Sequence, residues 1–174
     1  GLTLGGAGIG TISSIIGTGT GTLTKIGTGI WTLSGNNEFT GLTSISAGTL
    51  RLGSTGNATN GPLGTVDNGV NITAGALDLN GFTLATAEAI TVRGTGISAG
   101  GAITNSSATA ADYSGLVTIG AISTIATNAG DLNLTHTGTI TGAFALTLSG
   151  SGNGSIASII GTGIGTVIKS GTGS

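Results

Sequence analysis

The most familiar catalytic spacing in the chain is Gly96-Ile97-Ser98-Ala99-Gly100, which spells the GxSxG motif of a nucleophile elbow. Asp112 or Asp131 and then His136 follow in the order in which α/β-hydrolases supply their acid and base. The elbow requires a sharp turn from a strand into a helix, within a parallel sheet flanked by helices. Because no long glycine-free stretch carries the apolar spacing of a helix, we interpret this motif as a turn between strands.

Carboxylate pairs are a second possible source of chemistry, since glycoside hydrolysis needs two acids at a fixed separation. The six acids are well separated in sequence: Glu38, Asp67, Asp78, Glu88, Asp112 and Asp131. In a coiled structure two of them could meet on neighbouring turns, for example Asp67 with Glu88. We interpret these acids as solvated residues on faces and turns. A polysaccharide-acting β-helix enzyme is kept as an alternative function.

Metal and cofactor chemistry has little to draw on in this sequence. The chain has no Cys and a single histidine, His136, whereas a zinc site takes three or four ligands. The sequence therefore predicts no metal-binding, cofactor-binding or catalytic residues, and we expect His136 to lie at the surface. The overall prediction is a protein that is not an enzyme.

Two threonine-rich runs resemble the threonine arrays of ice-binding solenoids. They are Thr18-Gly19-Thr20-Gly21-Thr22-Leu23-Thr24 and Thr135-His136-Thr137-Gly138-Thr139. A flat ice-binding face needs Thr-x-Thr at the same position of each successive turn, and glycine interrupts the first run. We interpret the runs as threonine ladders on outward faces, where hydroxyl side chains pair across strands. An ice-binding solenoid is the second alternative.

The composition excludes two classes of partner. The net charge is −2 and only four of 174 residues are basic: Lys25, Arg51, Arg93 and Lys169. A nucleic-acid interface requires clustered cations that displace counterions from phosphates, and scattered ones do not suffice. No apolar run reaches the roughly 18 residues of a membrane-spanning helix, so we expect no membrane insertion of this segment.

The chain contains an internal repeat with a period of 144 residues. Residues 1–30 align without gaps to residues 145–174, and 19 of the 30 pairs are identical, including Lys25 with Lys169. We therefore divide the sequence into one full unit, residues 1–144, and the start of the next, residues 145–174. This predicts a section of a tandem array in which the residues after Ser174 resemble Trp31 onward. The expected partners are neighbouring copies of the unit, joined end to end.

Within the unit, short segments alternate apolar residues with threonine or another polar residue. Leu2-Thr3-Leu4, Leu77-Asp78-Leu79 and Leu146-Thr147-Leu148 are examples. This period of two predicts half-buried strands, and the glycine or asparagine at their ends predicts turns. A tandem repeat without a linker favours a structure that grows along one axis. We therefore predict an all-β fold, a parallel β-helix with about six or seven turns per unit, using the 20–24-residue turn of known solenoids.

The predicted core is a stack of aliphatic side chains that point inward from the strands. We expect these residues to be mostly buried: Ile15, Ile16, Leu33, Ile45, Leu50, Leu77, Leu79, Ile90, Ile119, Leu134, Leu146 and Leu148.

One stretch resembles a known family. Residues 27–41, Gly-Thr-Gly-Ile-Trp-Thr-Leu-Ser-Gly-Asn-Asn-Glu-Phe-Thr-Gly, followed by Ser44-Ile45-Ser46-Ala47-Gly48-Thr49-Leu50, are similar to the autotransporter-associated β-strand repeat. The family pattern reads roughly GTGTLTLSGNNTYTGxTTIxAGTLxLG. This chain has Ile30-Trp31 where the pattern has Thr-Leu, and Glu38-Phe39 where it has Thr-Tyr. Both departures keep strand character.

The resemblance implies a right-handed parallel β-helix in the passenger of a giant bacterial surface or secreted protein. It thereby implies an extracellular or outer-surface location. From it we predict a non-enzymatic structural stalk or fibre segment that acts as a rigid spacer or filament. An adhesive role, with contacts to a surface receptor or to other fibres, is left open.

Overall fold

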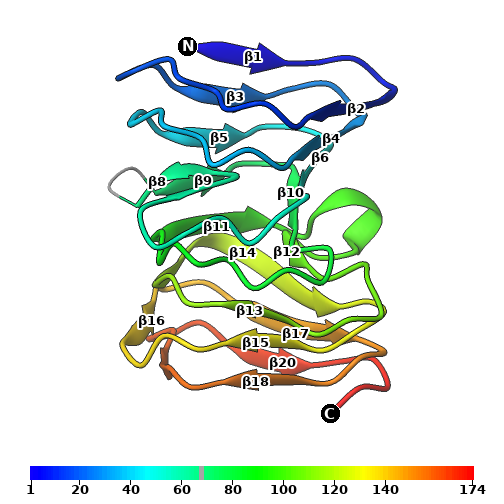
Figure 1. The fold of residues 1–174 in the computed structure, drawn as a ribbon. Coiled ribbons are helices and arrows are strands. Elements are labelled where there is room, and N and C mark those ends of the chain that lie inside the picture. Colours follow the sequence, from blue (N-terminus) through cyan, green and yellow to red (C-terminus); the bar gives the residue numbers. More distant parts are fainter. Residues whose placement is uncertain (67–68) are drawn as a thin grey trace.

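The computed structural model describes residues 1–66 and 69–174 and shows a coil of parallel strands stacked along one axis. Figure 1 shows the turns following one another from the N-terminus at one end to the C-terminus at the other. Eight successive turns are defined by the strand pairs on one side of the coil, and each of these pairs is parallel. The predicted all-β parallel β-helix is thus confirmed, while its handedness stays a prediction.

Each turn has three sides, and two of them carry continuous ladders. Side one consists of β1 (Leu2–Leu4), β3 (Leu23–Lys25), β5 (Thr43–Ile45), β9 (Val70–Ile72), β11 (Ile90–Gly94), the first part of β14 (Val117–Thr127), β16 (Thr139–Thr141) and β19 (Ile159–Gly161). Side two consists of β2 (Ile9–Ile12), β4 (Ile30–Leu33), β6 (Thr49–Leu52), β10 (Ala76–Asp78), β12 (Ile103–Thr104), the second part of β14, β17 (Leu146–Gly150) and β20 (Val167–Lys169). Because β14 runs through the corner, it joins both ladders into one 15-stranded sheet.

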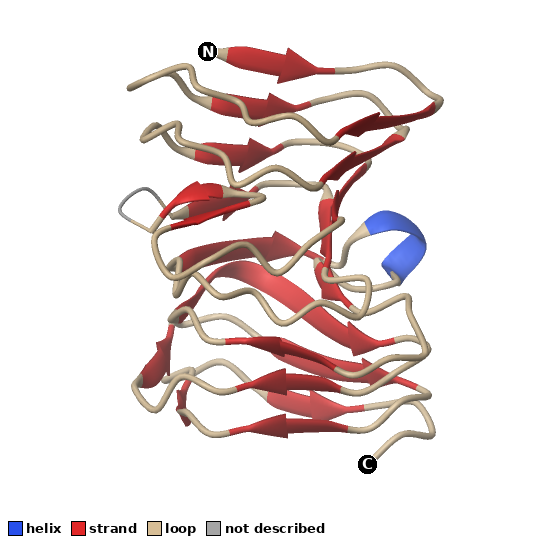
Figure 2. Cartoon of the chain, in the orientation of Figure 1, coloured by secondary structure: helices blue, strands red, loops and turns tan. Residues whose placement is uncertain are grey.

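Side three is regular only towards the C-terminal end. There β13 (Ala111–Tyr113), β15 (Leu132–Leu134) and β18 (Gly154–Ile156) form a separate parallel sheet. Nearer the N-terminus the same side is irregular and carries the antiparallel pair β7 (Asn60–Gly61) and β8 (Gly64–Thr65). A single turn of 3-10 helix, η1 (Ile97–Ala99), projects from the corner between β11 and β12, as Figure 2 shows in blue.

Two buried asparagines replace missing ladder bonds on this irregular side. The Asn37 side chain accepts from the Ile16 N–H at 2.9 Å and donates to the Pro62 carbonyl at 2.8 Å, which links three successive turns. Asn105 does the same further along, accepting from the Gly81 N–H and donating to the Asp131 carbonyl, both at 2.9 Å. Buried backbone groups need partners, so these amides hold the coil together where strands are absent.

Turn length varies while the strands stay in register. A turn takes 20 residues where Leu23 pairs with Thr43, and 27 where Thr43 pairs with Val70. The extra residues form loops at the corners, and the paired strands keep their length of a few residues. Insertions are tolerated there because only the paired segments must match the turns above and below.

The interior is a column of aliphatic side chains, largely as predicted. Of the twelve expected core residues, ten are buried; Leu148 is only partly buried, and Ile15 is 58% exposed. The prediction for Ile15 was wrong because its neighbour Ile16 is the buried one, and consecutive residues of an extended segment point to opposite faces.

Truncating one core residue tests this inward register. Leu77 in β10 is fully buried, so we expect Leu77→Ala to lower the free energy of unfolding by about 2–5 kcal/mol. Ile122 in β14 is 63% exposed, and Ile122→Ala is the control. Chemical denaturation followed by circular dichroism measures both. Equal losses in the two variants would contradict the assigned register.

Candidate functional site

The GxSxG stretch is a surface turn, as the sequence analysis interpreted it. Gly96 has φ 75° and precedes the single turn η1, within which Ser98 has φ 51°. Ser98 lies at the corner between sides one and two, whereas His136 lies between β15 and β16, at the corner between sides three and one. The imidazole Nδ1 of His136 accepts from the Gly138 N–H at 2.8 Å, so it is engaged in its own turn. The fold does not assemble a hydrolase triad from these residues.

The acids are distributed in a way that corrects part of the sequence interpretation. Glu38 is exposed, and Asp112 and Asp131 are half-buried on side three or its corner. Asp78 and Glu88, in contrast, are buried, so the expectation of a solvated position was wrong for these two. The suggested pairing of Asp67 with Glu88 lies outside the described residues.

Asp112 and Asp131 lie on neighbouring turns of side three. Asp112 pairs with Asn133 on the next turn, and Asp131 lies two residues before Asn133. Such diagonal positions are about 7–8 Å apart between Cα atoms. The Asn133 amide donates to Asp112 at 2.8 Å and its carbonyl oxygen accepts from Ser155, which makes a polar ladder across three turns. Neither acid lines either of the two hollows described below.

Asp78 is an anchor between turns. Its carboxylate accepts from Arg51 Nε at 2.8 Å and from the Ser106 hydroxyl at 2.6 Å, and from the N–H groups of Asn80 and Ser106 at 3.0 Å. A hollow of about 160 Å³ lies beside it, under η1, and is lined also by Thr104 and Asn128. Because four donors bond to the carboxylate, Asp78 links the turns that line that hollow.

Glu88 is a carboxyl group enclosed in the core. Thr86 donates to its Oε1 at 2.9 Å, and its Oε2 has no partner among the described residues. The Tyr113 hydroxyl donates to the Glu88 main-chain carbonyl at 2.6 Å. Burial raises the pKa of Glu88 to about 8, although the Thr86 hydrogen bond acts in the opposite direction. The group is therefore mostly protonated at neutral pH, which removes the cost of burying a charge.

The threonine runs do not form a repeated Thr-x-Thr surface. In β16 both Thr139 and Thr141 lie on one strand, but their partners in β19 are Ile159 and Gly161. Side one instead carries a single line of small polar residues in register: Thr3, Thr24, Ser44, Asn71, Thr91, Thr118 and Thr141. This line is a ladder with one polar side chain per turn. The ice-binding arrangement considered above needs Thr-x-Thr, and thus two threonines per turn.

Lys25 is the most unusual charged residue of the fold. It occupies an inward position of β3 and is fully buried. Its ammonium group donates to the carbonyls of Ile26 at 2.8 Å and Gly27 at 2.9 Å, and to Ala47 on the following turn at 3.1 Å. Burial lowers the pKa of this amine. Gly48 has φ 62°, and a Cβ there would lie 2.4 Å from the backbone carbonyl oxygens of Gly27 and Gly29, so this position beside the cage requires glycine.

The equivalent lysine at the other end keeps two of the three acceptors of this cage. Lys169 in β20 is exposed, and its ammonium donates to the carbonyls of its own turn: Ser170 at 3.2 Å, Gly171 and Gly173. Ser170 and Gly171 are the repeat equivalents of Ile26 and Gly27. The acceptor that Ala47 supplies from a following turn has no counterpart here. Val167, the equivalent of the fully buried Leu23, is likewise 47% exposed.

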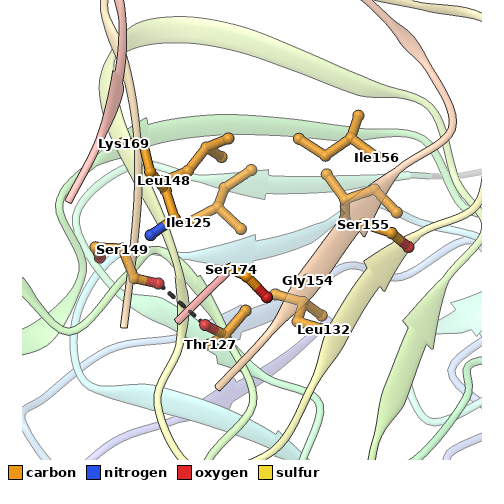
Figure 3. A pocket seen from close by; sticks show the side chains of 11 residues that line it. Ile125, Thr127, Leu132, Leu148, Ser149, Gly154, Ser155, Ile156, Lys169 and Ser174 are labelled. Atoms are coloured by element: carbon orange, nitrogen blue, oxygen red, sulfur yellow. Dashed lines mark hydrogen bonds between the residues drawn. The ribbon is translucent and has the colours of Figure 1, made fainter. Parts of the chain in front are cut away.

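A hollow of about 140 Å³ opens beside this last turn. Its lining is mainly apolar and includes Ile125, Leu132, Leu148, Ile156, Lys169 and Ser174. Figure 3 shows the aliphatic side chains around the space, with the Lys169 amine beside Ser149. The same end exposes Ile159, Ile164 and Ile168. Together these residues, which we call the C-terminal surface, form the candidate functional site: the uncovered edge of the core.

Within residues 1–66 and 69–174, no three carboxylate or imidazole groups gather as they would to hold a metal ion. Over the same residues, the structure has no helix of the length and apolarity needed to cross a membrane.

Comparison with known proteins identifies one segment. Residues 23–52 match the family described as the passenger-associated-transport-repeat. The match covers β3 to β6 and coincides with the stretch in which the sequence analysis found its resemblance, so the predicted similarity to autotransporter passenger repeats is confirmed. The searches of curated proteins and of solved structures gave no match.

The two lysines give a matched test of the cage. We expect Lys25→Met to lower the free energy of unfolding by about 1–3 kcal/mol, because it leaves buried carbonyls without their donor. Lys169→Met is the control at the equivalent, uncovered position and should leave the denaturation midpoint unchanged. If both variants behaved alike, the covering turn would contribute nothing to the lysine's role.

Glu88 gives a pH-dependent prediction. Its pKa is about 8 in the fold against 4.5 for the free side chain, so the native state holds the proton more tightly than the unfolded state. Stability from this group is therefore complete below pH 4.5 and is lost as the pH rises through about 8, by on the order of a few kcal/mol. Glu88→Gln should flatten this decline in urea denaturation between pH 5 and 9. The control Glu38→Gln, at an exposed position, should retain it; an unchanged slope in Glu88→Gln would contradict the assignment.

Proposed function

We propose that the chain is a section of a structural stalk in which 144-residue units continue one another as a single coil. Residues 1–144 form one unit, and residues 145–174 begin the next. The observation that carries the proposal is the C-terminal surface, which repeats the first turn of the chain without the turn that covers it. In the first copy, residues 31–52 supply that cover: β4 pairs with β2, and β5 pairs with β3.

The partner of the C-terminal surface is therefore a segment like residues 31–52 from the following unit. It would bury Val167 as Leu23 is buried, fill the apolar hollow, and bring a carbonyl to Lys169 as Ala47 does to Lys25. Both apolar burial and the completed lysine cage favour this occupant over water. A charged or strongly polar partner would leave the exposed isoleucines uncompensated.

The stalk acts as a non-enzymatic spacer, and the passenger-repeat match supports a secreted or cell-surface location for it. The buried charged groups serve the fold: Asp78 with Arg51 and Lys25 with carbonyls link successive turns, and Glu88 is enclosed within the core. The described surface offers polar ladders of Thr, Ser and Asn, which suit a solvated stalk.

Arrays of different length test the spacer function. Adjacent strands are about 4.8 Å apart, so a unit of six to seven turns adds roughly 30 Å of length. We expect arrays of two, four and eight units to appear as thin rods in electron micrographs, with contour lengths in proportion to unit number. An eight-unit array in which residues 31–52 of each unit are scrambled is the control and should lose this proportion. Globular particles, or lengths that do not depend on unit number, would refute the proposal.

A further inference from the structure

The 144-residue period does not equal a whole number of turns. Leu2 in β1 belongs to side one and pairs with Leu23. Its repeat equivalent, Leu146 in β17, belongs to side two, where it pairs with Ser123 on the preceding turn and Val167 on the following turn. Side one has by then completed six turns, from Leu2 to Ile140 in β16. The second copy thus begins six turns and one side further along the coil.

The next element is displaced in the same sense. β2 on side two pairs with β4, whereas its repeat equivalent β18 lies on side three and pairs with β15. Likewise β3 is on side one and its equivalent β20 is on side two. All three pairs of equivalent strands are therefore shifted by one side, which excludes a local slip of a single strand.

The local structure is nevertheless the same in both copies. The Leu2 N–H donates to the Thr22 carbonyl at 2.8 Å, and the Leu146 N–H donates to the Thr166 carbonyl at 2.8 Å. The bond from Ile26 to Leu4 likewise recurs from Ser170 to Leu148, again at 2.8 Å in both. The positive-φ glycines also coincide: Gly19 and Gly163 both have φ 58°, and Gly27 and Gly171 have φ 69° and 78°. One sequence thus forms one structure on two different pairs of sides.

We infer that each unit is rotated by one side of the coil, about a third of a turn, relative to the unit before it. This inference rests on the proposed function, in which units continue as one coil. It follows that surface features are presented along three lines around the rod, and that a feature returns to the same line only every third unit. The projecting η1 corner between β11 and β12, with exposed Ser98, would thus face three directions in successive units.

The rotation sets how the η1 corners are spaced along and around the rod. A partner that binds the η1 corner meets it on every side of the rod, at an axial spacing of about 30 Å per unit and about 90 Å along any one line. If every unit had the same orientation about the axis, the rod would instead present all of its η1 corners along one edge.

Spin labels in the chain itself test the rotation, since it contains no cysteine to compete for the label. Thr3 and Thr141 both lie on the outward line of side one, six turns apart, which predicts a separation of about 29 Å between their Cα atoms. Thr147 is the repeat equivalent of Thr3 but lies on side two, paired with Thr124. We expect the double variant T3C/T147C to give a longer electron–electron distance than T3C/T141C. Equal distances in the two variants would overturn the inference, because a repeat of six whole turns places Thr147 in line with Thr3 at the same axial height as Thr141.

A four-unit array separates this inference from the spacer function. Thr95→Cys, beside η1, is introduced into chosen units, and a gold label is attached to each cysteine. We expect the labels of units one and four to lie on the same edge of the rod. The labels of units one and two should lie on different edges. Rods that carry every label on one edge would overturn the rotation and leave the spacer intact. An array that forms no rods would refute the spacer, while the distances within the single chain would still report the phase of the two copies.

Discussion

The need to pair every enclosed backbone N–H and C=O group governs this structure. A narrow coil has no second layer to supply partners, so the groups must bond to the turns directly above and below. Two sides meet this need with continuous parallel ladders. The third meets it with the short β13–β15–β18 ladder towards the C-terminal end and with side-chain amides elsewhere. Asn37 and Asn105 each bridge three turns at places where no strand is formed. The coil is continuous because these substitutions occur where the ladder fails.

The buried ionisable groups follow from the same geometry. An inward position on one turn faces main-chain atoms of the next, which suits a donor such as the Lys25 ammonium. Asp78 is held by donors from three turns, those of Arg51, Asn80 and Ser106. Glu88 has only the Thr86 hydroxyl, and burial accordingly favours its neutral form. Asp78 and Lys25 therefore link turns through their hydrogen bonds, whereas Glu88 is enclosed with a single side-chain partner from its own turn.

Much of the fold was predictable because strand alternation is a local signal. Leu77-Asp78-Leu79 and Leu2-Thr3-Leu4 indicate strands, and the repeat indicates growth along an axis. The burial of Lys25 and Glu88 was missed, although the pattern contained the signal: Lys25 is two residues from the buried Leu23, and Glu88 is two residues before the buried Ile90. The two-residue spacing indicates an inward side chain at both positions, whereas charge alone indicates exposure. The side of the coil on which the second copy begins could not be predicted from the sequence. Turn length varies from 20 to 27 residues, so the number of turns in 144 residues is known only from the structure.

The direction of the ladder bonds has a mechanical consequence. They lie along the axis of the coil, so a pulling force on the two ends loads them in tension and opens them in sequence from an end. A released turn of 20 residues can extend to about 70 Å, whereas in the stack it occupies about 4.8 Å. Each detached turn therefore lengthens the chain more than tenfold locally while the remaining turns stay folded. Such a coil yields stepwise under load and absorbs work, and it recovers by winding each turn back onto the edge that was exposed.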